Sequence, residues 1–221
     1  MSAVILDFDG PVADVFAGYP ASKIAERLVD LVRQFDTNLG KTLDGTTDPM
    51  EVLRQCQGVL SEDSLDWVET ELVHAEIQAA ESATVTPGAI NLFEQCSARG
   101  LPVIVASNNA EACIQLFLKR FRLTDNIHLV SARPFGRPDL MKPHKHVLSF
   151  ASNVAQIKLE SSLFIGDSAS DVEAGQTAGV PIIALANKEG KRAKFKHANA
   201  TAVVDHMDEV LSIIASRELI S

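Results

Sequence analysis

Short apolar runs alternate with amphipathic stretches along most of the chain, and the two patterns predict different elements. Residues 3–8 form an apolar run that ends at Asp9-Gly10-Pro11, which is typical of a buried strand followed by a turn. Apolar residues then recur at helical spacing over about 21–36, where we expect an amphipathic helix.

The region from about residue 15 to residue 83 is predicted to be all-helical. Two further periodic stretches lie at about 49–57 and 62–82, and a turn-rich connection over Asn38–Pro49 precedes them. The longer stretch follows Ser61, a favourable N-cap residue, and has two acids in its first turn, where negative charge suits the helix dipole.

From Thr86 onward, predicted strands and helices alternate. The strands are expected at about 101–106, 127–130, 162–165, 181–185 and 202–204, and the helices at about 88–99, 110–121, 143–154, after Asp171, and at about 206–217. Such alternation gives right-handed crossovers and a mostly parallel sheet. We therefore expect an α/β fold with a Rossmann-like doubly wound core, residues 1–14 and 84–221, and an inserted helical unit, residues 15–83.

Composition narrows the class of protein. The net charge of -9 argues against a nucleic-acid binder, which normally carries a basic excess. The three cysteines have no paired spacing, as expected of reduced thiols, and the longest apolar runs are too short for a membrane span. We expect a cytoplasmic protein that binds no membrane, while its oligomeric state stays open.

Polar side chains follow several of the predicted strands. Asp7-Phe8-Asp9 follows the first strand, Ser107-Asn108-Asn109 follows the strand at about 101–106, and Gly166-Asp167 follows the strand at about 162–165. Ligands of doubly wound sheets bind at the carboxyl ends of the strands, so these groups are expected to form one site.

Several carboxylates at one edge require a cation. Two carboxylates about 4 Å apart repel each other by roughly 4 kcal/mol at an effective dielectric of 20. The candidate ligands offer only oxygen, which favours a hard ion such as Mg²⁺ over Zn²⁺. The sequence therefore predicts an anion site built around Mg²⁺, with Lys142 as a further positive charge.

Four segments resemble, in order, the motifs of the haloacid dehalogenase superfamily. They are Asp7-Phe8-Asp9-Gly10, Ser107, Lys142-Pro143 and the segment from Gly166 to Asp171. The resemblance extends from residue 3 to about residue 205. The helical stretch between the first two motifs is similar to the small helical cap of the phosphoglycolate-phosphatase-like and β-phosphoglucomutase-like branch.

The resemblance implies a role for each candidate residue. Asp7 is expected to attack phosphorus and form an aspartyl-phosphate, with Asp9 as the general acid and base. Phosphate oxygens are expected to contact Ser107, Asn108 and Lys142, and Lys142 also neutralises charge in the transition state. The implied Mg²⁺ ligands are Asp7, Asp9 through its backbone carbonyl, Asp167 and Asp171.

The expected activity is hydrolysis of a phosphate ester of a small metabolite. Phosphatases of the family usually carry Thr where this chain has Pro11, and mutases lack that Thr, so a sugar-phosphate mutase is one alternative. A non-catalytic binding or regulatory protein with the same fold is another.

For several other residues the sequence gives less support for a role in the site. Arg133 and Arg137 flank a Pro/Gly-rich loop just ahead of Lys142, from which they could reach substrate, but we expect them to be solvated loop residues. Trp67 is expected to pack within the helical unit rather than to form a substrate platform. The basic stretch from Lys188 to His197 is expected to be a solvated face, and the alternative is a docking patch for an acidic partner or nucleic acid. Lys23 and Arg54 are the candidates for substrate contacts from the helical unit, although no feature of the sequence singles them out.

Overall fold

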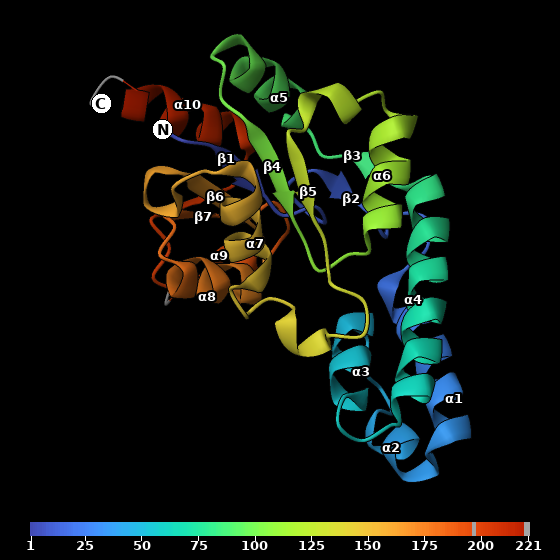
Figure 1. Ribbon diagram of the computed structural model, residues 1–221. Helices are drawn as coiled ribbons and strands as arrows, with labels where there is room; N and C mark the ends of the chain where they lie inside the picture. Colours follow the sequence, from blue (N-terminus) through green and yellow to red (C-terminus); the bar gives the residue numbers. More distant parts are fainter. Residues whose placement is uncertain (196–197, 219–221) are drawn as a thin grey trace.

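The computed structural model describes residues 1–195 and 198–218, and within them the chain forms a six-stranded parallel sheet. Its spatial order is β5-β4-β1-β6-β7-β8 (Figure 1). The strands are β1 (Val4–Leu6), β4 (Val103–Ala106), β5 (Leu129–Ser131), β6 (Leu163–Gly166), β7 (Ile182–Leu185) and β8 (Ala202–Val204). The central strand β1 pairs with β4 on one side and β6 on the other, so the three strand ends that carry candidate residues are neighbours.

Helices cover both faces of this sheet. One face packs against α5 (Ala89–Ala98), α6 (Glu111–Arg120) and α10 (Met207–Glu218), and the other against α7 (His146–Ala155), α8 (Ala169–Ala178) and α9 (Lys191–Phe195). Alternate residues of β1 enter the two cores, with Val4 and Leu6 on one side and Ile5 on the other. The predicted Rossmann-like doubly wound fold is confirmed.

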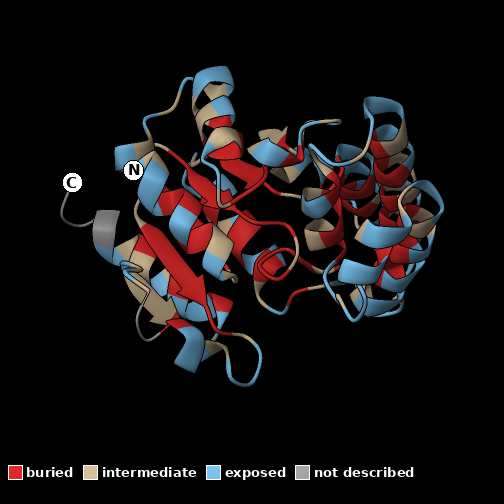
Figure 2. Ribbon diagram, turned by 90° about the horizontal axis from the view of Figure 1, so that it is seen from below, coloured by how far each residue is buried: buried red, intermediate tan, exposed pale blue. Residues whose placement is uncertain are grey.

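A helical segment projects from the sheet between β2 (Ala13–Asp14) and β3 (Thr84–Val85), which pair as an antiparallel ribbon. It contains α1 (Ala21–Phe35), α2 (Thr37–Thr42), α3 (Pro49–Cys56) and α4 (Glu62–Ser82). Figure 2 shows buried residues on the inner sides of these helices, and they are continuous with the core on one face of the sheet. Because β2 and β3 pair, the two ends of the segment lie together at the ribbon.

Two helices lie where the sequence pattern did not indicate them. Helix α2 falls in the stretch expected to be turns, because Asp36 caps it by accepting from the main-chain N–H groups of Asn38 and Leu39. Helix α9 falls in the basic stretch, of which Lys196 and His197 lie outside the described residues. Among the described residues, short 3-10 helices also lie at Thr124–Asn126, Pro138–Leu140 and Leu159–Ser161.

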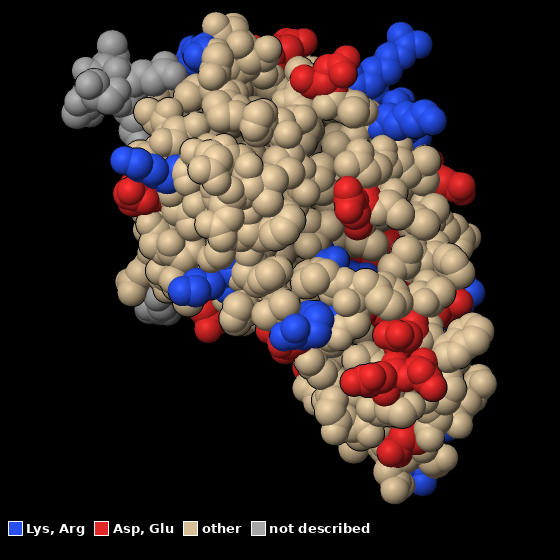
Figure 3. All heavy atoms as spheres, in the orientation of Figure 1, with Lys and Arg blue, Asp and Glu red and all other residues tan. Residues whose placement is uncertain are grey.

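The distribution of charged side chains, the state of the cysteines and the apolar character of the helices can be compared with the expectations from composition. On the face shown in Figure 3, Lys and Arg side chains are scattered, whereas Asp and Glu side chains gather over the helical segment. All three cysteines are buried and none is in a disulfide. In the described part of the chain, no helix combines the length and the apolar character that crossing a membrane requires.

Candidate active site

The sheet brings the predicted residues to one edge. Asp7 directly follows β1, Ser107 follows β4, and Asp167 follows β6. Because the three strands are parallel neighbours, their carboxyl ends open at the same edge. The structure therefore places these three residues together, as the sequence predicted.

Lys142 is the cation at the centre of the site. Its Nζ atom lies 2.7 Å from Asp7 Oδ1 and 2.6 Å from Asp171 Oδ1, and it donates to the Ala106 carbonyl at 3.1 Å. The residue is buried, so these contacts replace its hydration. Burial works to lower the Lys142 pKa, but Asp171 and Asp7 outweigh it and the pKa is raised.

Asn108 holds the main chain of Lys142. Its side-chain oxygen accepts from the Lys142 N–H at 2.7 Å, and its side-chain nitrogen donates to the Lys142 carbonyl at 3.1 Å. Arg54 of α3 donates to the same carbonyl at 2.9 Å. The amide of Asn108 therefore fixes the position of Lys142, while a contact between Asn108 and phosphate stays a prediction.

Three carboxylates gather beside Lys142. One oxygen each of Asp7, Asp167 and Asp171 lies within 4.8 Å of the other two. Asp171 Oδ2 accepts from the N–H groups of Asp167 and Ser168 and from the Ser168 hydroxyl, so Asp171 also caps α8. Its buried Oδ1 has no aligned hydrogen bond among the described residues and faces the Lys142 ammonium alone.

The donor set fits a hard divalent cation. It consists of carboxylate oxygens, one of which is buried without a hydrogen bond. Burial is the largest cause that raises the Asp7 pKa to about 7. The nearby Asp171 carboxylate adds to the rise, and the Lys142 ammonium opposes it. Burial also raises the Asp167 pKa, although Lys191 forms an ion pair with that carboxylate. The ammonium groups of Lys142 and Lys191 therefore do not fully offset the effect of burial on the pKa values of Asp7 and Asp167.

Asp9 lies beside this group and outside the cluster of three carboxylates. Its Oδ1 accepts from the Val15 N–H at 3.0 Å, which orients the carboxyl. Burial raises the Asp9 pKa to about 7, and Asp167 adds to the rise, whereas the bond from Val15 opposes it. A carboxyl with this pKa can both donate and accept a proton near neutral pH.

Gly10 allows the Asp167 side chain to pack directly against the main chain that follows Asp9. Its φ is +105°, and a Cβ atom built there would lie 2.1 Å from Asp167 Oδ2. Both the backbone conformation and the close contact exclude other residues without a rearrangement. The glycine of the first motif is thus required by the position of Asp167.

Ser107 is held by its neighbour Asn109. The Ser107 hydroxyl donates to Asn109 Oδ1 at 3.1 Å and accepts from the Asn109 N–H at 3.2 Å. Both residues line a cavity of about 290 Å³ that also contains Asp7, Asp9 and Lys142. The helical segment supplies the opposite wall through Phe16, Ala21, Thr47, Asp48, Pro49, Met50 and Arg54.

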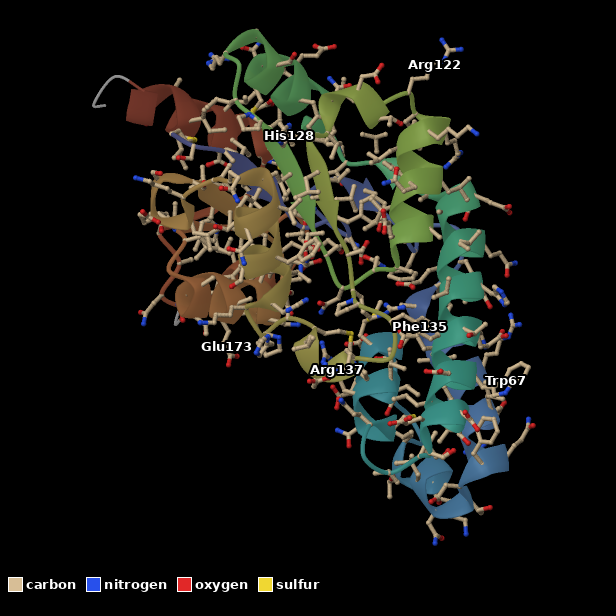
Figure 4. The ribbon with its side chains drawn as sticks, viewed as in Figure 1. Trp67, Arg122, His128, Phe135, Arg137 and Glu173 are labelled. Carbon is tan, nitrogen blue, oxygen red and sulfur yellow. The ribbon has the colours of Figure 1, made fainter. Side chains whose placement is uncertain are left out.

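Several other expectations have a clear outcome. Arg54 reaches the cavity, whereas Lys23 is an exposed partner of Glu26. Figure 4 shows Trp67 on the outer side of α4, and it is 65% exposed, so the prediction that it packs inside was wrong. Arg137 is exposed and pairs with Asp139, as expected of a solvated residue.

Arg133 is not solvated, because it lies buried between two acidic residues of α4. It contacts Glu69 at 2.7 Å and Glu76 at 3.0 Å, and all three side chains are at most 1% exposed. The sequence pattern gave these glutamates no role. The available indication was their position among apolar residues of one helix face, where an unpaired acid is not stable.

Known proteins match the chain at the level of both family and fold. A family model for haloacid dehalogenase-like hydrolases matches residues 4–185. The chain is 25% identical over 212 residues to a phosphoglycolate phosphatase of Pseudomonas fluorescens, covering 92% of this chain and 76% of that protein. A phosphoglycolate phosphatase of Rhodospirillum rubrum is 26% identical over 192 residues, with 83% and 78% covered.

Solved structures share the fold. A predicted phosphatase from Clostridium acetobutylicum superposes with a TM-score of 0.74 at 19% identity, covering 97% of this chain and 98% of that one. CbbY from Rhodobacter sphaeroides, solved in complex with phosphate, gives a TM-score of 0.68 at 15% identity, with 95% and 96% covered. At such identities the likeness concerns the fold alone.

Proposed function

The chain belongs to the haloacid dehalogenase-like hydrolase family, and we propose that it is a magnesium-dependent phosphatase acting on a small phosphorylated metabolite. Family membership and the phosphoglycolate phosphatases among its relatives support an enzyme that hydrolyses phosphoric monoesters. In the proposed reaction the Asp7 carboxylate attacks phosphorus, the P–O bond to the substrate breaks, and an aspartyl-phosphate forms. Water then attacks this phosphorus and regenerates Asp7.

The contact between Lys142 and Asp7 is the observation that carries the proposal. A carboxylate must be ionised to attack, and burial works against ionisation. The ammonium group 2.7 Å away favours the ionised form. The same ammonium group is placed to neutralise charge on the phosphoryl oxygens during transfer.

Asp9 is the proposed general acid and base. In the first step it gives its proton to the departing ester oxygen, and in the second it takes a proton from the attacking water. A pKa raised to about 7 suits both tasks, since both protonation states are populated near neutral pH. The bond from the Val15 N–H keeps the carboxyl oriented between the two steps.

The residues proposed to hold Mg²⁺ are Asp7, Asp167, Asp171 and the main-chain carbonyl of Asp9. The clustered carboxylate oxygens support the three side chains as ligands. When bound, the ion supplies positive charge that lowers the repulsion between the acidic site and a phosphate dianion. Ser107, Asn108 and Lys142 are the proposed contacts of the phosphate oxygens.

We assign residues 15–83 as a cap over the core formed by residues 1–14 and 84–221. The ribbon of β2 and β3 joins both ends of the cap to the core. Because cap residues line one wall of the cavity, the cap would exclude water from the reacting phosphate. A cavity of about 290 Å³ suits a compact substrate, and phosphoglycolate is the first ester to test.

A sugar-phosphate mutase is the second candidate, and Pro11 is the observation in its favour. Phosphatases of the family usually carry Thr at this position, and Pro11 has no hydroxyl. A mutase would transfer the phosphoryl group back to a sugar phosphate and release little phosphate.

The three buried thiols without a disulfide support the further proposal of a cytoplasmic location.

Phosphate release from a panel of esters, with and without Mg²⁺, tests the proposal. We expect release from p-nitrophenyl phosphate and from at least one small metabolite ester, lost on chelation. Asp7→Asn should abolish it, because an amide does not form the acyl-phosphate. Full activity of folded Asp7→Asn would exclude covalent catalysis by Asp7, and release only after a bisphosphate activator is added would favour the mutase.

A further inference from the structure

A buried ion-pair network joins α4 to the loop that contains Ser107. Arg133 follows β5, and its guanidinium donates to Glu69 Oε1 at 2.7 Å and to Glu76 Oε2 at 3.0 Å. It also donates to the main-chain carbonyl of Asn108 at 2.6 Å. The side chains of Arg133, Glu69 and Glu76 are at most 1% exposed, so water does not weaken these contacts.

Glu76 continues the network into the site. Its Oε1 accepts from Asn109 Nδ2 at 2.8 Å, and its Oε2 accepts from the Ala110 N–H at 3.3 Å. The Asn109 amide has one donor end and one acceptor end, so binding its nitrogen to Glu76 turns its oxygen toward Ser107. That oxygen accepts the Ser107 hydroxyl at 3.1 Å.

The Arg133 side chain holds the same loop through a contact with the loop's main chain. In a trans peptide the carbonyl and the N–H point in opposite directions. The Asn108 carbonyl points at Arg133, and the Asn109 N–H of the same peptide contacts Ser107 Oγ at 3.2 Å. Through Asn108, which also holds Lys142, the network reaches the cation beside Asp7.

We propose that Glu76 and Arg133 are positioning residues that hold Ser107, Asn109 and the Asn108–Asn109 peptide in the geometry that binds a phosphate group. The inference rests on the proposed function, because it assigns the loop after β4 to phosphate. It adds a requirement that no motif expresses: an acid on the last cap helix sets the orientation of the phosphate loop. Ser107 would exchange the Asn109 oxygen for a phosphate oxygen when the ligand binds.

Glu69 offers a matched control for Glu76. Both are buried acids of α4 and both accept from Arg133. The second oxygen of Glu69 accepts from the Gly136 N–H, in a loop that does not line the cavity. A glutamine at 69 can keep its oxygen on Arg133 and then loses only the bond from Gly136, outside the site. A glutamine at 76 turns its NH₂ against a donor of Asn109 or of Ala110, whichever way it lies.

The test measures thermal unfolding of the full chain with Mg²⁺ at increasing inorganic phosphate, because ligand-dependent stabilisation reports affinity. We expect both Glu69→Gln and Glu76→Gln to lower Tm without phosphate. Glu76→Gln should weaken phosphate binding about tenfold, the effect of one unsatisfied donor, while Glu69→Gln changes it less than about threefold. Equal effects of the two variants, or no phosphate binding by the wild type, would overturn the proposal.

A second pair protects the test against misfolding. Glu76→Asp and Glu69→Asp keep the buried charge and shorten the side chain by one methylene, so they replace the glutamines if either of those fails to fold. Only Glu76→Asp should weaken phosphate binding. A wild type that hydrolyses no ester would refute the proposed function, whereas an active wild type whose paired variants behave alike would refute the positioning role alone.

Discussion

The Nζ atom of Lys142 lies 2.7 Å from Oδ1 of Asp7, and the two side chains are only 2% and 11% exposed. At about 3 Å and an effective dielectric of 20, a pair of opposite charges attracts by roughly 5 kcal/mol. Asp171 is as close to the same ammonium group, so one cation serves two acids. Removal of that cation leaves two buried carboxylates uncompensated.

Lys142→Met should therefore lose activity and change the titration of Asp7. The methionine fills similar volume but supplies no charge, and we expect kcat/KM for p-nitrophenyl phosphate to fall by about 100-fold or more. Without Lys142 the pKa of Asp7 should rise further, which moves the low-pH limb of the rate profile to higher pH. Lys145→Met, which removes an exposed lysine nearby, is the control and should retain the wild-type profile.

The hydrophobic pattern of the sequence was sufficient to predict the residues at the strand ends. It was insufficient to predict the ion-pair network around Arg133. Asp7, Ser107 and Asp167 each follow an apolar run, and parallel pairing brings such ends together whatever the helices do. Arg133 is separated from Glu69 by 64 residues and from Glu76 by 57, so only the packing of α4 reveals their contact. Trp67 was misjudged for a related reason, since its aromatic side chain lies off the buried stripe of α4.

Helix α2 shows a second limit of pattern. Its stretch contains a glycine and threonines, which suggested turns, yet Asp36 satisfies two N–H groups and starts a helix of six residues. A cap of this kind offsets weak propensity by about 1 kcal/mol. The preceding helix supplies the packing that a short helix lacks on its own.

Asp167→Asn and Asp171→Asn should separate metal binding from folding. Asp171 accepts three hydrogen bonds that cap α8, so its amide variant should lower Tm as well as Mg²⁺ affinity. The Asp167 pKa is raised, which means that burying its charge costs stability. Asp167→Asn should therefore weaken Mg²⁺ binding by about tenfold or more without lowering the Tm of the metal-free protein. Calorimetric titration with Mg²⁺ and thermal unfolding give the two readouts, and equal Tm losses would contradict the distinction.

The pH dependence should differ between good and poor leaving groups. Asp9 has a pKa raised to about 7, so its acid form is present below pH 7 and is lost as the pH rises above it. An alkyl phosphate needs that proton, and its kcat/KM should fall about tenfold per pH unit above the Asp9 pKa. Nitrophenolate leaves without it, so p-nitrophenyl phosphate should show no such fall. In Asp9→Asn the alkyl ester should be hydrolysed far more slowly than the nitrophenyl ester at every pH. A shared high-pH limb for both substrates would assign the limb to another group.

Gly10→Ala should damage both stability and the metal site, and Gly45→Ala separates the two causes. Both glycines have a positive φ, +105° at Gly10 and +81° at Gly45, which costs an alanine about 1 to 2 kcal/mol. At Gly45 an added Cβ meets no atom within 4 Å, so this backbone term should be the whole effect. At Gly10 the Cβ would lie 2.1 Å from Asp167 Oδ2, and Asp167 must move away. Urea unfolding should therefore show a further loss of about 1 to 3 kcal/mol for Gly10→Ala. Mg²⁺ affinity should fall in this variant alone, because its alanine displaces a proposed ligand, and unchanged affinity would show that Asp167 does not hold the ion.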